Sequence, residues 1–350
     1  MKRIELMDYG RFLAIMGVVA FHYLFNGIAN GKISSITYIL SITGIVKYGY
    51  LGVEFFFMTS GYVIFISAQN KTASEFAVAR LARLYPAFWS AVIFTSTFAF
   101  FWGGKQMSVD PTQIAINLTM LAPVFGYNFV DGVYWTLPYE LEFYLLVLIF
   151  LLLGMQKRLK SIFLMWPFAI LLSQISGKHL PYLGNYHCYF AAGVILAMMK
   201  NNFTLKAAIA LSICLILCIN FSIMNTPPVV KSRYSDFIIG LIVVTLFLFL
   251  IFINSKKGSD LKLYGSTLLG ALSYPIYLIH AHFGYMFISQ FGTEKNKYFV
   301  YIITVLLVFM VSYFIHIFVE ERYSQVWKIF FQKTIGNLVS IIHRPLASIR

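Results

Sequence analysis

Long apolar stretches follow one another along almost the whole chain, separated by short polar segments. Each is close to the roughly 20 residues that a helix needs to cross the hydrocarbon core of a bilayer. The runs are continuous rather than alternating, which favours helices over the strands of a β-barrel. The pattern predicts an all-α integral membrane protein, a bundle of about ten transmembrane helices. The expected spans are 6–26, 50–68, 85–103, 133–154, 161–176, 183–199, 205–224, 236–254, 266–290 and 298–319. The fifth run is short, so it could be a tilted span or a re-entrant segment.

Composition supports a membrane protein and excludes a soluble one. Of the 350 residues, 59% are hydrophobic and 11% are charged, and the mean hydropathy is +0.77. A soluble domain carries roughly 25% charged residues. The seven His and three Cys residues do not cluster with carboxylates at ligand spacing, so no metal site is expected.

The net charge of +14 indicates how the chain is oriented in the membrane and is not a sign of a nucleic-acid partner. With the N-terminus inside, most of the 27 Lys and Arg residues fall in inner loops and tails. We therefore expect both termini in the cytoplasm and a multi-pass protein of the plasma membrane, the inner membrane of a bacterium. The first run lacks a cleavage site and is read as a retained helix.

The chain is expected to form one transmembrane domain, residues 1–322, followed by a basic amphipathic tail, residues 323–350. Val326, Ile329 and Phe330 recur at helical spacing in the tail. This pattern is typical of a helix lying on the cytoplasmic leaflet. A frayed tail is the alternative.

Asp8, Arg11 and His22 lie inside the first apolar run, Leu6–Phe25. At about 100° per residue they share one side of a helix, and Arg11 and His22 are roughly 16 Å apart along its axis. Ionisable groups inside a span are costly and usually mark function. The structural alternative is that Asp8 pairs with Arg11 and that His22 bonds a backbone carbonyl.

Two further motifs contain candidate binding or catalytic residues. Arg80 and Arg83 share a helix face at i, i+3, and two guanidinium forks so placed suit a phosphate or pyrophosphate. Ordinary positive-inside charge is the alternative. Glu140 and Tyr144 share a face at i, i+4 near the start of the fourth run, and Trp135 precedes them as an interface anchor or a binding residue.

Ser60, Tyr277 and His280 complete the candidate set. Ser60 stands beside Gly61, a small pair typical of close helix approach. Ser273, Tyr277 and His280 fall along one face of the ninth run, either as a binding surface or as a hydrogen-bonded helix contact around Pro275.

The expected topology predicts where each of these side chains lies across the bilayer. We expect Arg80 and Arg83 at the inner edge, and His22 and Glu140 in the outer half. A phosphate-bearing donor could then dock inside and extend its reactive end towards His22, while the acceptor arrives from outside.

These motifs, in this order, resemble those of the acyltransferase-3 family of multi-span membrane acyltransferases. The matching elements are Asp8-x-x-Arg11…His22, Gly52-Val…Phe56-Phe57…Ser60-Gly61, Arg80-x-x-Arg83-x-Tyr85-Pro86, Trp135…Glu140…Phe143-Tyr144 and Ser273-Tyr274-x-Ile276-Tyr277-Leu278-Ile279-His280. The chain departs from the family pattern at Glu320-Glu321-Arg322-Tyr323, which lacks a following Pro, and at Pro138, where a small polar residue is usual.

The resemblance implies transfer of an acyl group, most often acetyl from acetyl-CoA, to a sugar hydroxyl of a cell-surface or exported glycan. Lipopolysaccharide, exopolysaccharide and lipid-linked sugars all remain open as acceptors. It implies His22, Glu140 and Arg11 as catalytic residues, and acyl-CoA, a glycan and membrane lipids as partners. The expected substrate-binding residues are Arg80, Arg83, Asp8, Tyr144, Trp135, Ser60, Tyr277 and His280.

Two other classes compete with an enzyme. A transporter or flippase for a sugar, a lipid-linked sugar or an anionic substrate would line its path with the same polar residues. It should neither need acyl-CoA nor hydrolyse it. A scaffold in a polysaccharide-synthesis complex would leave the buried charges unexplained.

Overall fold

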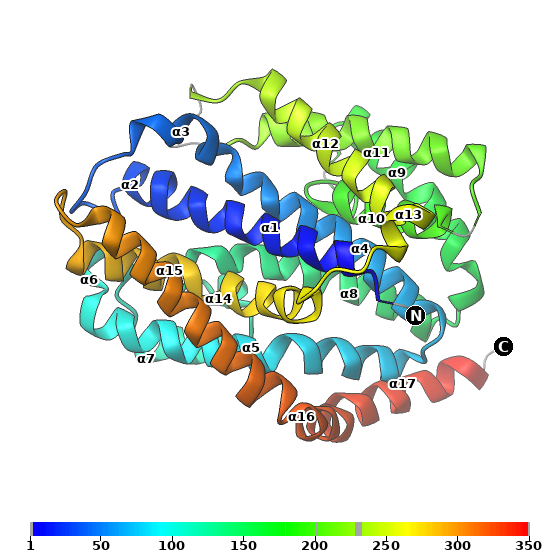
Figure 1. Ribbon diagram of the computed structural model, residues 1–350. Helices are drawn as coiled ribbons and strands as arrows, with labels where there is room; N and C mark the ends of the chain where they lie inside the picture. The colour runs from blue at the N-terminus through cyan, green and yellow to red at the C-terminus, as the bar shows by residue number, and fades with distance from the viewer. Residues whose placement is uncertain (1–2, 179, 201, 228–232, 349–350) are drawn as a thin grey trace.

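The chain folds into a bundle of long helices, described here in a computed structural model for residues 3–178, 180–200, 202–227 and 233–348. Both chain termini lie at the same end of the bundle (Figure 1). In the described part, eight helical segments are long and apolar enough to cross a membrane: Glu5–Ala29, Leu40–Gln69, Ala73–Trp102, Gly132–Leu152, Gln156–Ile175, Leu205–Met224, Asp236–Asn254 and Lys297–Glu321. The predicted class, a multi-pass helical membrane protein, is confirmed.

The two remaining predicted spans are also helices. The sixth run forms α10 (His187–Met199), which has only 13 residues. The ninth forms α14 (Ser266–Phe291), 26 residues long and rich in buried polar side chains. The fifth run, left open by the sequence, forms a helical segment of 20 residues, Gln156–Ile175, that includes α9 (Leu159–Ile175).

Several spans contain more than one helical piece. The first consists of α1 (Glu5–Phe21), a π-helical turn (His22–Asn26) and α2 (Gly27–Ala29). The second consists of α3 (Leu40–Val46), a 3-10 turn (Lys47–Leu51) and α4 (Gly52–Gln69). The other long helices are α5 (Ala73–Trp102), α8 (Leu137–Leu152), α11 (Leu205–Met224), α12 (Asp236–Asn254) and α15 (Lys297–Phe314).

Helix α5 begins about three turns before the predicted start of the third span, residue 85. Thr72 and Glu75 form a capping box, in which Glu75 Oε2 accepts the Thr72 backbone N–H at 2.8 Å and the Thr72 hydroxyl accepts the Glu75 N–H at 3.3 Å. Such a cap satisfies backbone donors that a helix start leaves unpaired. Arg80 and Arg83 therefore lie within the helix rather than ahead of it.

The connection between α5 and α8 folds back along α5. Its helix α7 (Pro111–Asn117) lies beside α5 (Figure 1). The Trp89 indole N–H donates to the carbonyl of Leu118 at 2.9 Å, and the Tyr85 hydroxyl donates to that of Thr119 at 3.0 Å. The chain thus returns towards the middle of α5 before α8 begins.

Helices α4 and α10 pack backbone against backbone at two glycines. A Cβ built on Gly193 would lie 1.9 Å from the Met58 carbonyl oxygen, and one built on Gly61 would lie 2.2 Å from that of Phe190. Small residues permit this close approach where lipid removes the usual hydrophobic driving force between helices. Since α4 carries part of the site described below, this contact fixes its position.

The tail is helical in the described residues, forming α16 (Ser324–Phe331), a π-helical turn (Gln332–Gly336) and α17 (Asn337–Ser348). The rings of Trp327 and Phe331 lie 5.9 Å and 6.0 Å from that of Trp89, and the Ser74 hydroxyl donates to the Gly336 carbonyl at 2.9 Å. The tail therefore packs on α5 rather than fraying. Its location on a membrane surface stays a prediction.

We predict that Gly193→Ala destabilises the bundle by about 1–3 kcal/mol, because the added methyl group overlaps the α4 backbone. The thermal unfolding midpoint of purified protein in detergent measures the effect. Gly240→Ala on α12 is the matched control, since its Cβ would meet nothing closer than Ile219 Cγ2 at 3.7 Å. Equal midpoints for the two variants would contradict the packing described.

Candidate active site

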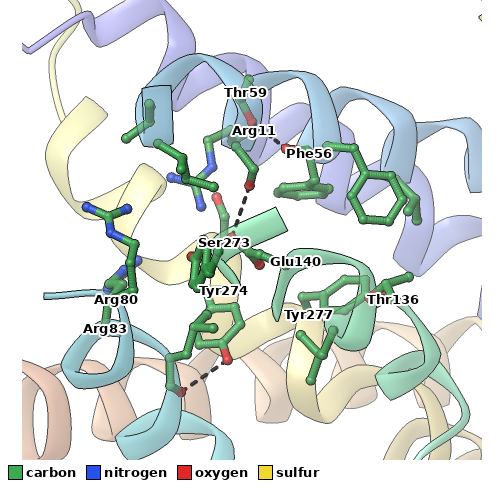
Figure 2. Close-up of a pocket in the computed structure, with 18 residues that line it drawn as sticks. Arg11, Phe56, Thr59, Arg80, Arg83, Thr136, Glu140, Ser273, Tyr274 and Tyr277 are labelled. Carbon is green, nitrogen blue, oxygen red and sulfur yellow. Dashed lines mark hydrogen bonds between the residues drawn. The ribbon is translucent and has the colours of Figure 1, made fainter. Parts of the chain in front are cut away.

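A pocket in the middle of the bundle gathers most of the predicted site residues. Its volume is about 140 Å³, and α1, α4, α5, α8 and α14 line it. Arg80 and Arg83 lie at one side, Tyr277 and Thr136 at the other, and Glu140 and Ser273 between them (Figure 2). The lining includes seven residues predicted from the sequence: Arg11, Ser60, Arg80, Arg83, Glu140, Tyr144 and Tyr277.

The three arginines of the pocket are unequally paired. Arg83 Nη1 forms an ion pair with Glu320 at 2.8 Å. Arg80 Nη2 donates to the Ser67 hydroxyl at 3.1 Å, while its buried Nε has no hydrogen-bond partner. Arg11 has neither a hydrogen bond nor an ion pair to any described residue, and its guanidinium lies 6.0 Å from the Phe56 ring. Guanidinium groups that keep free donors are suited to a phosphate or another oxyanion.

Glu140 supplies a carboxylate in the same pocket. Its Oε1 accepts hydrogen bonds from the Tyr144 hydroxyl at 2.7 Å and from the Ser60 hydroxyl at 3.1 Å. Its Oε2 makes no hydrogen bond to a described residue. Two donors on one oxygen fix the side chain and leave the other oxygen available for a ligand.

A second pocket adjoins the first, and residues close to the N-terminus and to the start of the tail line it. It has a volume of about 400 Å³ and shares Arg11 and Arg83 with the central pocket. Asp8 and Arg3 also line it, joined by an ion pair of 2.5 Å. Arg11 and Arg83 therefore stand at the boundary between the two pockets.

The central pocket ends at Tyr277. The Tyr277 hydroxyl donates to the Val133 carbonyl at 2.8 Å and lies 2.7 Å from the Thr136 hydroxyl. Its ring lies 5.9 Å from the imidazole of His280. Tyr277 therefore separates the arginine-lined pocket from a pair of histidines.

His22 and His280 form that pair. His280 Nε2 lies 3.1 Å from His22 Nδ1. His280 is completely buried in α14, and His22 is half-buried at the end of α1. The two predicted residues, 258 positions apart in the chain, are thus in direct contact.

Backbone contacts fix the proton positions of the neutral pair. His280 Nδ1 lies 2.8 Å from the Tyr277 carbonyl, which can only accept, so Nδ1 carries the proton and Nε2 the lone pair. His22 Nδ1 lies 2.9 Å from the Val18 carbonyl and therefore also carries a proton, which it can share with His280 Nε2. The lone pair of His22 is left on Nε2, which has no partner among the described residues. A neutral, oriented imidazole with one free nitrogen can act as a base or a nucleophile.

Two π-helical turns carry residues of the site. One begins at His22, and the other, Ile315–Glu321, carries Glu320 together with His316, whose Nδ1 lies 3.1 Å from Glu320 Oε2. π-helical turns inside α-helices occur frequently at functional sites because they re-aim side chains.

One expectation from the sequence needs correction. Glu140 shares a pocket with Arg80 and Arg83 instead of lying well outside them, because the chain folds back along α5 before α8 begins. The structural alternative for the first span is half right. Asp8 pairs with Arg3 and not with Arg11, whereas His22 does contact a backbone carbonyl, that of Val18.

Trp135 lies outside the pocket. It is 39% exposed, and its ring packs against Tyr186 at 5.1 Å and Tyr139 at 6.1 Å. Its neighbours Thr136 and Leu137 line the pocket, but Trp135 itself does not. This position fits the interface-anchor alternative better than contact with a substrate in this pocket.

Sequence reasoning missed some residues that the fold brings to the site. Glu320, the partner of Arg83, was noted only as a departure from a family pattern. Ser67 and Thr136 are common residues with no distinctive spacing. His282 stands two residues after His280, and that His-x-His spacing was the available signal. Among the described residues, His, Cys, Asp and Glu side chains form no group of three or more that could hold a metal ion.

Comparison with known proteins identifies one family. A family model described as an acyltransferase domain, that of the acyltransferase-3 family, matches residues 4–331, essentially the whole chain. No curated protein and no solved structure matches significantly. The match includes His22, His280 and the lining of the two pockets except Arg3.

We predict that Glu320→Gln increases the affinity of the protein for inorganic pyrophosphate about tenfold, because it frees the Arg83 guanidinium and a hydrogen bond to a charged group contributes about 1.5–3 kcal/mol. Titrating pyrophosphate against the thermal unfolding midpoint measures this. Glu321→Gln removes the same charge from a neighbouring side chain that is 68% exposed, and it should change the affinity little. An equal gain in both variants would mean that net charge, and not the Arg83 pair, sets the affinity.

Proposed function

Because the chain belongs to the acyltransferase-3 family and is a membrane acyltransferase, we propose that it transfers an acetyl group from cytoplasmic acetyl-CoA to a hydroxyl of a surface or exported glycan. The observation that carries the proposal is the hydrogen-bonded pair of His22 and His280, with a pocket lined with arginines on the other side of Tyr277. The proposed location is the plasma membrane, the inner membrane of a bacterium.

The arginines supply the donor site. The diphosphate of CoA is a bidentate anion, and guanidinium forks match it in geometry and charge. Arg80 and Arg83 are within one helical turn of each other, and Arg11 enters from α1 with unused donors. The central pocket is too small for a whole CoA molecule, so we assign it to the acyl end and the pantetheine arm. The nucleotide would occupy the wider second pocket of about 400 Å³.

His22 carries the chemistry in this proposal. Its free Nε2 accepts the proton of the acceptor hydroxyl while the hydroxyl oxygen forms a bond to the thioester carbonyl carbon. The tetrahedral intermediate then expels the CoA thiolate, and His22 Nε2 donates its proton to that thiolate. A route through a transient acyl group on Nε2 uses the same nitrogen and the same leaving group.

The remaining residues have supporting roles. A guanidinium without a partner, as on Arg11, can stabilise the oxyanion of the intermediate. Glu140 Oε2 is available to hold the pantetheine amides or the sugar. His280 is a positioning residue, since it holds the His22 ring in one tautomer and touches no reacting atom.

We predict that His22→Ala lowers transfer by at least about 100-fold, the usual contribution of a general base. Purified protein in nanodiscs is given radiolabelled acetyl-CoA and a crude glycan extract, and release of free CoA and labelling of glycan are followed. His187→Gln is the matched control, because His187 lies outside the central pocket and the histidine pair. Activity of His22→Ala within a few-fold of the parent would contradict the proposal. A protein that neither binds nor consumes acetyl-CoA or any other acyl-CoA would instead favour a transporter.

We predict that His280→Ala lowers kcat about 10- to 100-fold with little change in the KM for acetyl-CoA, because only the orientation of His22 is lost. His280→Gln should restore part of kcat, since its amide oxygen can accept the His22 Nδ1 proton. The same transfer assay, run over a range of acetyl-CoA concentrations, separates the two constants. Loss of activity through KM alone, or equal loss in both variants, would show that His280 does not act through His22.

A further inference from the structure

Lys32 presents a cation without an anionic partner close to the histidine pair. It follows α2, at the end of the bundle opposite the chain termini (Figure 1). Its side chain is half-buried, and it makes no ion pair with any described residue. Burial lowers the pKa of Lys32, which is the expected effect on an ammonium group removed from water.

His282 holds the Lys32 ammonium in place. The Lys32 Nζ lies 2.7 Å from His282 Nε2. His282 Nδ1 lies 2.9 Å from the Val130 carbonyl and so carries the ring proton, which leaves Nε2 as the acceptor. The backbone N–H of Gly132 also donates to this Nε2, at 3.2 Å. The ammonium thus uses one of its three donors on a neutral partner and keeps two.

A buried carboxylate rigidifies this arrangement without neutralising it directly. Asp131 is fully buried, and its two oxygens accept the backbone N–H groups of His282 at 2.9 Å and Val133 at 3.1 Å. No Asp131 oxygen lies within 4 Å of the Lys32 Nζ. Because its oxygens accept backbone N–H groups from both segments, Asp131 holds the segment that carries Gly132 against α14.

The chain next to Lys32 is exposed at Gly132. A Cβ built on Gly132 would lie 3.3 Å from His282 Nε2 and 3.9 Å from the Lys32 Nζ and a His282 ring carbon. One aromatic ring lies near both Lys32 and the histidine pair. The Lys32 Nζ lies 5.9 Å and the His22 imidazole 6.0 Å from the centre of the Tyr285 ring.

We propose that Lys32, positioned by His282, binds a negatively charged group of the acceptor sugar, so that the acceptor class is an acidic sugar that carries a carboxylate or a phosphate near the acylated hydroxyl. This inference rests on the proposed transfer to a sugar hydroxyl at His22. It names a second anion site, at the opposite end of the bundle from the donor arginines. A held ammonium with two unused donors, near the same Tyr285 ring as the base, would favour an anionic sugar over a neutral one of the same shape.

Matched probes test this directly. Binding of methyl β-D-glucuronide is compared with that of methyl β-D-glucoside, and binding of glucose 6-phosphate with that of glucose, by calorimetry on the full chain in nanodiscs. We expect at least one anionic probe to bind about tenfold more tightly than its neutral partner, which also tells a carboxylate from a phosphate. Lys32→Gln should abolish that preference. Lys47→Gln should keep it, because Lys47 contacts the Arg233 carbonyl and lies outside the cluster.

A second variant leaves the charge in place. Gly132→Ala would put a methyl group 3.3 Å from His282 Nε2, so the imidazole that holds the lysine must shift by a few tenths of an ångström, and the preference should fall even if Lys32→Gln does not fold. Equal binding of anionic and neutral probes by the parent, or a preference that survives both variants, would overturn the inference.

The radiolabel assay keeps this outcome separate from that of the proposed function. CoA release that depends on His22, with no preference for anionic sugars, would overturn the acceptor class alone. A preference that depends on Lys32, with no acetyl-CoA turnover, would overturn the transfer reaction alone.

Discussion

Charge inside an apolar bundle is the constraint on which the site depends. A guanidinium in a membrane span is costly unless it meets an anion or water. The central pocket brings three together, and among the described residues only Arg83 has an ion pair, with Glu320. Glu140 accepts from hydroxyl groups rather than from an arginine. The positive charge that is left without an ion pair would attract a phosphate-bearing ligand, and a larger pocket adjoins it at Arg11 and Arg83.

The bundle uses backbone contacts to hold the reactive groups in one orientation. Carbonyl oxygens of Val18 and Tyr277 fix the tautomers of His22 and His280, and the carbonyl of Val130 does the same for His282. The other ring nitrogen then keeps its lone pair, which is free on His22, faces His22 on His280, and faces Lys32 and the Gly132 N–H on His282. Tyr277 then stands between the arginines and the histidines, tied to the segment that precedes α8. In the proposed reaction, the donor and the acceptor would therefore approach from opposite sides of Tyr277.

Helical periodicity was enough to predict which side chains share a face. It placed Arg11 on the polar side of the first span, and it grouped three pairs that do line the pocket: Arg80 with Arg83 on α5, Glu140 with Tyr144 on α8, and Ser273 with Tyr277 on α14. It could not predict the depth of Glu140, which depends on the return of the chain along α5 and on bonds from Trp89 and Tyr85 to backbone carbonyls. The pairs His22–His280, Arg83–Glu320 and Lys32–His282 each join residues more than 200 positions apart, so no local pattern contains them.

The central claim is that the donor enters at the end of the bundle that carries the termini and that its acyl group is used at His22. Proteoliposomes of a single orientation, given radiolabelled acetyl-CoA on one side or the other together with glycan extract on both, test it most directly. The account predicts release of CoA only when acetyl-CoA is supplied on the side of the termini, and loss of that release in His22→Ala. Equal turnover from both sides, or turnover that persists without His22, would contradict it.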